Sequence, residues 1–293
     1  QSWQGLTAAE RLVLAQISVC VDGVSVNMTE DIVDTSSLSN PPWTLDIIDS
    51  LINKSLLTVD RSKQELRFKS LQIIRKYAGR QVDGSVLVAA RERMAKHLSK
   101  LHMIRSAHID WAMYYYRLQA ERQNIIRSIE YCRHYGWSFL HGELVLSLCQ
   151  LYLLAGPHPS IPSMVENVID LENIDPRTRS RLCRSMCTYT RLIGQYELSL
   201  DWYMKGIKVL ERKPNSKCEC ELELNVLRNY TDMGRYDDAE AAFARAMQVA
   251  EFSRSRRLVA LALIDYGYLL CQKSDMPEAT TALERATRIL VSI

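Results

Sequence analysis

The 293-residue sequence has no segment of the kind that inserts into a membrane or directs export. No apolar run approaches the roughly 18 residues that a membrane-spanning helix requires. The N-terminus lacks the charged region followed by an apolar stretch that marks a signal peptide. We therefore expect a cytoplasmic protein without a membrane partner. Because the chain begins at Gln1 and has no initiator Met, we also expect it to be part of a longer protein.

The sequence also has little excess charge. It contains 37 Lys and Arg residues against 34 Asp and Glu residues, giving a net charge of +3 and an isoelectric point of about 8.4. Domains that bind nucleic acids usually have an isoelectric point above about 9, so the overall charge gives no sign of nucleic-acid binding. Hydrophobic residues make up 47% of the chain, which is typical of a globular protein with a buried core.

Motifs for catalysis are missing as well. No phosphate-binding loop of the form G-x-x-x-x-G-K-[ST] occurs, so this chain by itself is not expected to hydrolyse ATP. The six histidines are scattered, and none lies in a motif with a cysteine or serine nucleophile. Two of them, His97 and His102, are expected to face solvent from a helix. We therefore predict that the chain is not an enzyme and has no catalytic residues.

The eight cysteines include no C-x2-C pair, which is the spacing of common zinc sites. Cys183 and Cys187 lie one helical turn apart in the sequence. Together with Cys218 and Cys220, just before the next helix, they leave a four-thiolate zinc site as one interpretation. Packing in the core, where a free cysteine behaves as a small hydrophobic residue, is the preferred one. We predict no metal site and no cofactor in this chain.

The C-terminal part of the sequence repeats with a period of 40 residues. The segments LIGQYELSLDWYMKGIKVL (192–210), DMGRYDDAEAAFARAMQVA (232–250) and QKSDMPEATTALERATRIL (272–290) align without gaps. Aligned columns share a residue type: Gly194, Gly234 and Ser274; Tyr196, Tyr236 and Met276; Ser199, Ala239 and Ala279; Tyr203, Phe243 and Leu283; Gly206, Ala246 and Ala286. Small residues let two helices approach closely, aromatic residues fill the space between them, and the glycine ends the first helix. The repeating unit is thus predicted to be a helical hairpin.

This pattern resembles the tetratricopeptide repeat. Its signature G-x-Y-x-x-A-x-x-x-F/Y-x-x-A-x-x-L is matched by residues 234–249, with Val249 at the last position. The resemblance implies an α-solenoid in which hairpins stack on one another. Weaker helical patterns precede the repeats, so we expect a helical array from about residue 86 to the end.

Residues 6–82 follow a different pattern. Thr7 and Glu10 form a predicted capping box at the start of a helix, and two further helices are expected before residue 55. The segments SLLTV and ELRF then predict a β-hairpin around DRSKQ, followed by the helix SLQIIRKYAGRQV. Three helices followed by a hairpin, or wing, make a winged-helix domain.

The predicted fold class is mainly α: a small winged-helix domain followed by an α-solenoid of tetratricopeptide-like helical hairpins. Residues 1–82 are assigned to the winged-helix domain. Residues 83–176 are assigned to a helical linker with degenerate repeats, and residues 177–293 to the repeats of 40-residue period.

The same segments resemble the region that follows the nucleotide-binding core in bacterial STAND proteins, which are signal-transduction ATPases with numerous domains. The resemblance is carried by L-I-x-K-S-L-L, R-F-x-x-L-x-x-I-R-K-Y-A and L-x-A-E-x-x-N-I-x-x-x-I-E-Y-C. The matching residues are Leu51, Lys54, Ser55, Leu56, Leu57, Arg67, Leu71, Ile74, Arg75, Tyr77, Ala78, Leu118, Glu121, Asn124 and Ile125. It implies a transcriptional or signalling regulator whose winged helix contacts a nucleotide-binding domain of the same protein. ATP or ADP with Mg²⁺ would be bound only by that domain, which is absent from this chain.

In tetratricopeptide arrays the first helix of each hairpin lines a concave groove, and the 40-residue alignment carries these positions onto the sequence. The predicted groove residues are Arg181, Arg184, Thr188, Arg191, Asn225, Arg228, Thr231, Asp265 and Tyr268. Spacings of three and four place those of the first repeat on one helical face. We expect a groove that is basic at one end and binds a protein or peptide partner or a small acidic effector. The alternative is a solvated helix face.

Two other functions are compatible with the sequence. One is a DNA-binding winged-helix regulator, and the other is a plain tetratricopeptide scaffold for protein interactions. The helix before the wing carries Asp46 and Asp49, which would face phosphates unfavourably, whereas Arg75, Lys76 and Arg80 come after the wing. Direct DNA binding by this chain is therefore not expected, and the winged helix is interpreted as a protein-facing element.

Overall fold

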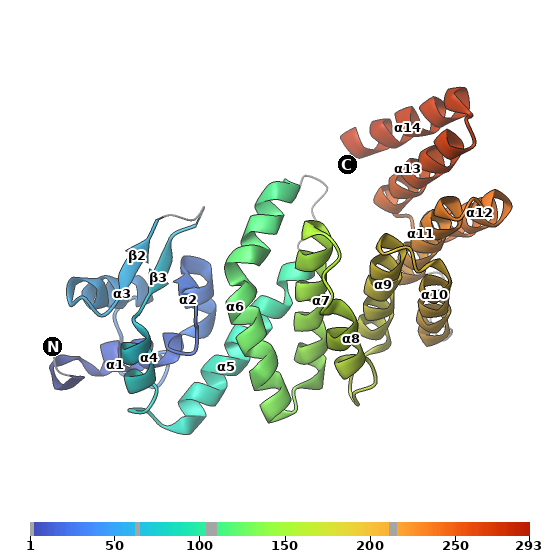
Figure 1. Cartoon of the computed structure of the whole chain (residues 1–293). Helices are drawn as coiled ribbons and strands as arrows, with labels where there is room; N and C mark the ends of the chain where they lie inside the picture. The colour runs from blue at the N-terminus through green and yellow to red at the C-terminus, as the bar shows by residue number, and fades with distance from the viewer. Residues whose placement is uncertain (1–2, 62–64, 104–109, 211–215) are drawn as a thin grey trace. The chain divides into compact units, whose positions relative to one another are not determined.

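The computed structural model describes residues 3–61, 65–103, 110–210 and 216–293 (Figure 1). Contacts divide these residues into two compact units. Unit 1 comprises the described residues up to 103 together with 111–148, and unit 2 comprises those from 149 onward. This division does not coincide with the boundaries predicted at residues 82 and 176, because the helices after residue 82 pack on those before it.

Unit 1 begins with short helices and a small sheet. In chain order these elements are η1 (Trp3–Gly5), α1 (Ala8–Ile17), β1 (Val24–Ser25), α2 (Val26–Ile32), α3 (Thr44–Asn53), β2 (Thr58–Asp60), β3 (Arg67–Lys69) and α4 (Gln72–Ala78). The predicted capping box is present at α1, since the Thr7 side chain accepts from the Glu10 N–H and the Glu10 carboxylate accepts from the Thr7 N–H. It satisfies two backbone donors that the helix leaves unpaired.

The sheet of unit 1 has the strand order β1-β3-β2, and both pairings are antiparallel. The expected hairpin is observed as β2 and β3, where Val59 faces Phe68. Its turn residues 62–64 lie outside the described residues. No pattern in the sequence predicted β1, in which Val24 pairs with Phe68 from the other side. Strand β3 is therefore the central strand of the sheet.

Three longer helices follow in the chain: α5 (Gly84–Ser99), α6 (Trp111–Tyr135) and α7 (Ser138–Ala155), with η2 (Leu101–Met103) between the first two. Helix α5 packs against α1, α2 and α6. The core here includes Met94 and Leu98 of α5 and Leu118 and Ile125 of α6, all fully buried. Burying such side chains contributes about 1.5–3 kcal/mol each, which explains why α5 and α6 belong to unit 1.

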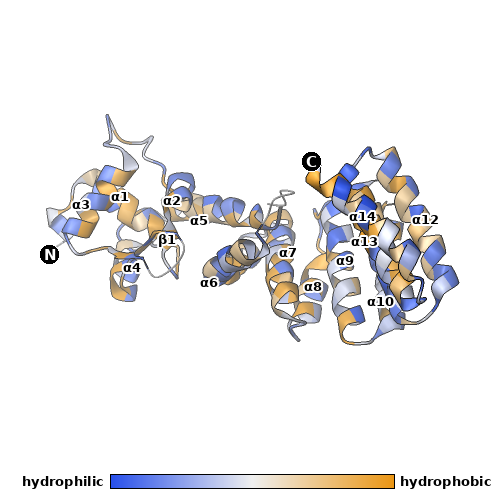
Figure 2. Cartoon of the chain, turned by 90° about the horizontal axis from the view of Figure 1, so that it is seen from above, coloured by the Kyte–Doolittle hydropathy of each residue, from blue (hydrophilic) through white to orange (hydrophobic). Residues whose placement is uncertain are grey.

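Helix α7 is more apolar than the sequence analysis expected. Its 18 residues have a mean hydropathy of 1.4 and meet the length and composition of a membrane span. The expectation that no apolar run approaches this length was wrong, because His141 and Glu143 interrupt the run without much lowering its mean hydropathy. Figure 2 shows α7 coloured as hydrophobic along most of its length. Since 61% of the segment is buried inside the protein, it matches the core helix of a folded domain as well as a membrane span.

Unit 2 contains α8 (Ile161–Ile169) and then three antiparallel helical hairpins (Figure 1). The hairpins are α9 (Pro176–Leu192) with α10 (Tyr196–Leu210), α11 (Lys217–Asp232) with α12 (Tyr236–Phe252), and α13 (Arg256–Gln272) with α14 (Met276–Val291). Within each hairpin the two helices pack together, and α11 also packs on both α9 and α13. The predicted mainly α fold with a solenoid of helical hairpins is confirmed.

The turns within the hairpins explain the glycine column of the repeat. Gly194, Gly234 and Ser274 all adopt the left-handed conformation, with φ of 76°, 73° and 64°. In the second hairpin the Gly234 N–H donates to Thr231 O and the Arg235 N–H to Tyr230 O, and equivalent bonds occur in the other two. Such bonds satisfy the last carbonyls of the first helix. Glycine adopts this conformation without strain, whereas Ser274 does so at a cost.

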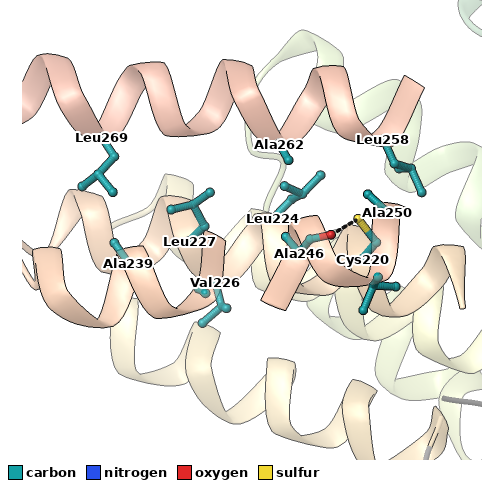
Figure 3. Close-up of a cluster of buried hydrophobic side chains, with 12 residues drawn as sticks. Cys220, Leu224, Val226, Leu227, Ala239, Ala246, Ala250, Leu258, Ala262 and Leu269 are labelled. Atoms are coloured by element: carbon teal, nitrogen blue, oxygen red, sulfur yellow. Dashed lines mark hydrogen bonds between the residues drawn. The ribbon is translucent and has the colours of Figure 1, made fainter. Parts of the chain in front are cut away.

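The aligned repeat positions that hold small residues allow the helices to pack closely. A side chain added at Gly206 would place its Cβ 2.8 Å from Leu222 Cδ1, so the two helices approach at this glycine. In the next repeat the Cys220 thiol donates to Ala246 O at 3.4 Å (Figure 3). Phe243 stacks on Tyr266 with ring centroids 4.0 Å apart. Small residues bring the helices together, and aromatic residues fill the space beside them.

Candidate functional site

The first helices of the hairpins, α9, α11 and α13, share a polar face whose residues pair from one repeat to the next. Arg184 Nη1 lies 3.3 Å from Glu221 Oε2, and Thr188 Oγ1 donates to Asn225 Oδ1 at 2.7 Å. Arg228 Nε donates to Asp265 Oδ1 at 2.7 Å. Each partner is 37 residues further along the chain, hence about one helical turn before the equivalent position in the 40-residue repeat.

One carboxylate connects all three helices. Asp232, at the end of α11, accepts from Arg191 Nη1 of α9 at 2.7 Å and from the Tyr268 hydroxyl of α13 at 3.0 Å. We call this set the first-helix face; it consists of Arg184, Thr188, Arg191, Glu221, Asn225, Arg228, Asp232, Asp265 and Tyr268. Seven of the nine predicted groove residues are thereby brought together.

The other two predicted residues lie differently. Thr231 is 3% exposed, and its hydroxyl donates to Leu227 O within its own helix, so it does not reach the first-helix face. The 40-residue alignment placed it with Arg191, but the residue of α11 that reaches this face is the next one, Asp232. Arg181 is partly buried on α9, one turn before Arg184. The acidic partners Glu221 and Asp232 were missed, because the alignment compares equivalent positions and not neighbours.

The pairing changes the charge expected of this face. Three of its arginines, Arg184, Arg191 and Arg228, are each matched by a carboxylate of the following repeat. These residues therefore do not form a groove that is basic at one end. Asp265 is 3% exposed. Burial raises its pKa, and the charge and hydrogen bond of Arg228 act in the opposite direction.

Several polar atoms of the first-helix face remain without a hydrogen bond. In the described structure, Arg184 Nε, Arg191 Nε and Asp265 Oδ2 are buried and unpaired. Buried polar groups are nearly always hydrogen-bonded in folded proteins.

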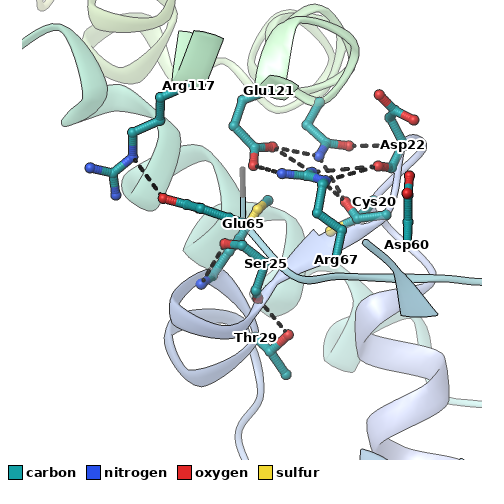
Figure 4. Close-up of polar contacts among 12 residues, drawn as sticks. Cys20, Asp22, Ser25, Thr29, Asp60, Glu65, Arg67, Arg117 and Glu121 are labelled. Atoms are coloured by element: carbon teal, nitrogen blue, oxygen red, sulfur yellow. Dashed lines mark hydrogen bonds and ion pairs between the residues drawn. The ribbon is translucent and has the colours of Figure 1, made fainter. Parts of the chain in front are cut away.

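A second polar cluster fastens the sheet of unit 1 to α6 (Figure 4). Arg67 of β3 forms an ion pair with Glu121 of α6, and both side chains are almost completely buried. Arg67 Nη2 also donates to Gly23 O at 3.0 Å. Asn124 donates to Glu121 Oε2 at 2.7 Å and accepts from the Val21 N–H at 2.9 Å. The cluster joins β3, the segment before β1, and α6 through directional bonds.

The residues of this cluster are among those that carried the STAND resemblance. Arg67 and Glu121 are 54 residues apart in sequence, and the structure places them in direct contact. Arg75, from the same motif, donates to Cys20 O at 2.8 Å and to Val21 O. The motif residues Leu118 and Ile125 lie in the core. The quoted pattern thus describes one packing arrangement within unit 1.

An unexpected set of catalytic residue types occurs in the core. His102 Nε2 lies 3.0 Å from Glu143 Oε2, and its Nδ1 lies 3.3 Å from Ser147 Oγ. His102 was expected to face solvent, which is wrong, since it is only 2% exposed. Glu143 and Ser147 are buried to a similar degree, so a substrate cannot reach the hydroxyl in this conformation. A motif search could not find the set, because the histidine and the helix that faces it are about 40 residues apart.

Two other sequence interpretations concern His97 and the cysteines. His97 is partly exposed, and its Nδ1 lies 2.6 Å from Asp31 Oδ2. Cys183 and Cys220 are buried, and burial raises the pKa of each thiol to about 12. A thiol with so high a pKa is a poor metal ligand at neutral pH. Within the described ranges, no three His, Cys, Asp or Glu residues lie close enough together to hold a metal ion.

Comparisons with known proteins support the repeat assignment. The family model described as Tetratricopeptide repeat matches residues 220–290, which include α12, α13 and most of α11 and α14. No curated protein matches the chain. Among solved structures, the chain is similar to a Signal Transduction ATPase with Numerous Domains (STAND) protein with a tetratricopeptide repeat sensor from Pyrococcus horikoshii. The sequence identity is 10% and the TM-score 0.33.

That similarity extends over 98% of this chain but only 51% of the archaeal protein, so the chain spans about half the length of that structure. A TM-score this low does not establish a common arrangement of the whole chain. The tetratricopeptide repeats of residues 220–290 are therefore the part of the chain whose family is shown. Repeats of this kind serve in protein interaction.

Proposed function

We propose that this chain is the sensor and relay part of a cytoplasmic STAND-type regulatory ATPase. In this proposal the solenoid of unit 2 binds a protein or peptide partner along the first-helix face. Unit 1 acts as a winged-helix domain that passes the change to a nucleotide-binding domain of the same protein. ATP or ADP with Mg²⁺ belongs to that further domain, since the sequence has no phosphate-binding loop.

The observation that carries the proposal is the first-helix face itself. Its paired side chains link each hairpin to the next, so a ligand bound across α9, α11 and α13 changes how the hairpins stack. The Arg228 guanidinium, whose side chain is 40% exposed, and the exposed Tyr268 hydroxyl supply donors that a peptide backbone can reach. Extended solenoid surfaces are the binding surfaces of repeat proteins generally.

The paired charges favour a peptide partner over a small acidic effector. An acidic ligand would have to displace Glu221, Asp232 or Asp265 from their arginines, and Asp265 is too buried to move away easily. A peptide bonds both donors and acceptors without breaking these pairs. Tyr268, which is 42% exposed, adds an amphipathic ring of the kind enriched at protein interfaces.

The relay function of unit 1 is supported by its element order and by the buried contacts of β3. Three helices, a β2–β3 hairpin and a following helix are the elements of a winged helix. The Arg67–Glu121 pair connects the hairpin to α6, which gives a rigid path between the two. The helix before the hairpin, α3, carries Asp46 and Asp49, which supports a protein-facing role over DNA reading.

The first experiment tests the partner-binding face. Peptides selected by display against the whole chain should lose at least about tenfold in affinity when Tyr268 is replaced by alanine, because interface aromatics often contribute 2 kcal/mol or more. The matched control is Phe252→Ala, an exposed aromatic residue of α12 that lies outside the first-helix face. Equal losses for the two variants, or losses only for Phe252→Ala, would place the binding site elsewhere.

The second experiment tests the relay in the full-length protein. A selected peptide should change the rate at which a fluorescent nucleotide is released, because binding that favours one of two states shifts their populations. Replacing Arg184 and Arg191 by alanine should weaken that response while leaving nucleotide binding without peptide unchanged. If the peptide binds the solenoid but never alters nucleotide release, the chain is a plain interaction scaffold and the STAND assignment fails. The STAND assignment also fails if the native reading frame of the full-length protein encodes no phosphate-binding loop.

A further inference from the structure

Unit 1 contains a basic pocket that is separate from the first-helix face. It has a volume of about 570 Å³ and is lined by α4, α5, α6 and the residues that follow α1. Pockets of roughly 300–1,000 Å³ hold small molecules. The cationic side chains that line it are Arg75, Lys76, Arg80, Arg91 and Arg127. These residues come from α4 and the turn after it, from α5 and from α6, so the fold gathers charge that is dispersed along the sequence.

Most of this charge has no acidic counterpart. Within the described structure, Lys76, Arg80 and Arg91 form no ion pair, and Arg75 donates only to backbone carbonyls. Glu130 is the one acidic residue that lines the pocket, and it pairs with Arg127. The five cations and one anion leave a charge of about +4 in the pocket, although the whole chain carries only +3.

The arginines of the two polar clusters described above differ in this respect. On the first-helix face Arg184, Arg191 and Arg228 all have carboxylate partners, and Arg67 in the core of unit 1 has Glu121. Gathering unpaired like charges in a concave site destabilises the folded protein unless an anion neutralises them. The pocket therefore has the electrostatics of a site whose counter-ion comes from outside the chain.

The pocket is also preorganised. The guanidinium groups of Arg91 and Arg127 both lie against the ring of Tyr131, at 4.7 and 4.9 Å from its centre. Arg127 Nε donates to the Tyr131 hydroxyl, and Arg91 Nη1 donates to the Tyr135 hydroxyl. These contacts fix the two arginines in place without neutralising them. Arg91 and Arg127 are therefore held by aromatic side chains of α6 and face the pocket as cations.

We infer that this pocket binds a small molecule carrying two or more phosphate groups. The planar donors of arginine match phosphate oxygens in pairs, and four of the five cations are arginines. A di- or triphosphate carries about three to four negative charges at neutral pH, which balances the charge of the pocket. Leu87 and Ile126 add an apolar part to the lining, which suits an organic group attached to the phosphates.

The inference is tested by calorimetric titration of the whole chain with inorganic tripolyphosphate, ADP, AMP and citrate at about 50 mM salt. Tripolyphosphate and ADP should bind with a Kd below about 100 µM, and AMP should bind at least about tenfold more weakly. Citrate carries a similar charge on carboxylates and should also bind more weakly. If ADP binds more tightly than tripolyphosphate, the natural ligand is a nucleotide. If tripolyphosphate binds more tightly, the natural ligand is an inorganic or sugar-linked polyphosphate.

The variant that locates the site is Lys76→Glu combined with Arg80→Glu, since both side chains are exposed and their replacement should not disturb folding. This double variant should weaken the affinity for tripolyphosphate and for ADP by about tenfold or more, because each substitution removes a charge-assisted contact. Arg285→Glu on α14 is an exposed charge-reversal control and should leave affinity within about twofold. Circular dichroism checks that each variant is folded.

Three results would overturn the inference. One is the absence of phosphate binding up to about 1 mM. Another is binding that the Lys76 and Arg80 substitutions leave unchanged, which would place the anion elsewhere. The third is tight binding of a different anion. Citrate that binds as tightly as tripolyphosphate would make the pocket a general polyanion site. Duplex DNA that binds more tightly than tripolyphosphate, with the same sensitivity to the substitutions, would make it a nucleic-acid contact.

Discussion

Replacing Glu121 by alanine should strongly destabilise unit 1, because it leaves a buried arginine without its partner. Arg67 is 1% exposed, and its guanidinium forms an ion pair with Glu121. After the substitution its guanidinium would keep the carbonyl acceptors Asp22 O and Gly23 O but would lose its counter-charge. Asn124 would also lose one of its acceptors.

The expected cost follows from this burial. Removing one partner of a buried ion pair typically costs about 3–5 kcal/mol, because the remaining charge stays desolvated. A domain is usually stable by only about 5–15 kcal/mol in total. Replacing both partners, as in Arg67→Met with Glu121→Leu, removes both charges and should restore stability to within about 1 kcal/mol of the original protein or improve it. Asn124 would still donate to Gly23 O and accept from the Val21 N–H.

Hydrogen exchange at the amides of β1 and β3 is the appropriate measurement, because it reports the stability of unit 1 without requiring the whole chain to unfold in one step. The control is Glu92→Ala on α5, which breaks an exposed pair with Lys96 and should cost less than about 0.5 kcal/mol. The reasoning is refuted if Glu121→Ala costs less than about 1 kcal/mol, or if the double variant is as unstable as the single one.

Three further predictions concern pH, backbone conformation and packing. Burial raises the pKa of Glu10, but hydrogen bonds from Lys54, Ser50 and Thr7 outweigh burial and lower the pKa from 4.5 to about 2. The stability that the ionised carboxylate contributes should be present above pH 4.5 and lost as pH falls toward 2. Glu10→Gln should therefore flatten this part of the pH profile of urea unfolding. Ser274→Gly should raise the melting temperature and Gly234→Ser should lower it, each by a change of about 1 kcal/mol in unfolding free energy, because both positions are left-handed; equal signs for the two would contradict this. Gly206→Leu should destabilise unit 2 by about 1–3 kcal/mol in denaturant unfolding, and an unchanged midpoint would show that the helices can separate there without cost.

Local features were predictable from the sequence because neighbouring residues determine them. The capping box of Thr7 and Glu10 depends on residues three apart, and it is present in the structure. The left-handed turns at Gly194 and Gly234 follow from a glycine just after the end of a helix. Strand β1 has only two residues and no alternating pattern of its own, so only its pairing with β3 makes it a strand.

The polar contacts between elements were not predictable, because they depend on how the helices are placed in space. The sequence indicated the arginines of the first-helix face but not that Arg184 and Arg228 would meet acids 37 residues later. That offset is set by the stacking of successive hairpins and not by the repeat length. His102 was assigned to the surface for a similar reason, since nothing near it in sequence shows that α7 covers it with Glu143.

The two proposed binding sites use arginine in opposite ways, and this difference separates them experimentally. On the first-helix face the positive charges are matched within the protein, so recognition of a peptide would depend on hydrogen bonds and shape. In the pocket of unit 1, Lys76, Arg80 and Arg91 are unmatched, so binding there would depend on charge. Salt screens exposed charges over about 8–10 Å at physiological ionic strength. Raising the salt concentration should therefore weaken phosphate binding strongly and peptide binding little, and an equal salt dependence at both sites would contradict the assignment of at least one of them.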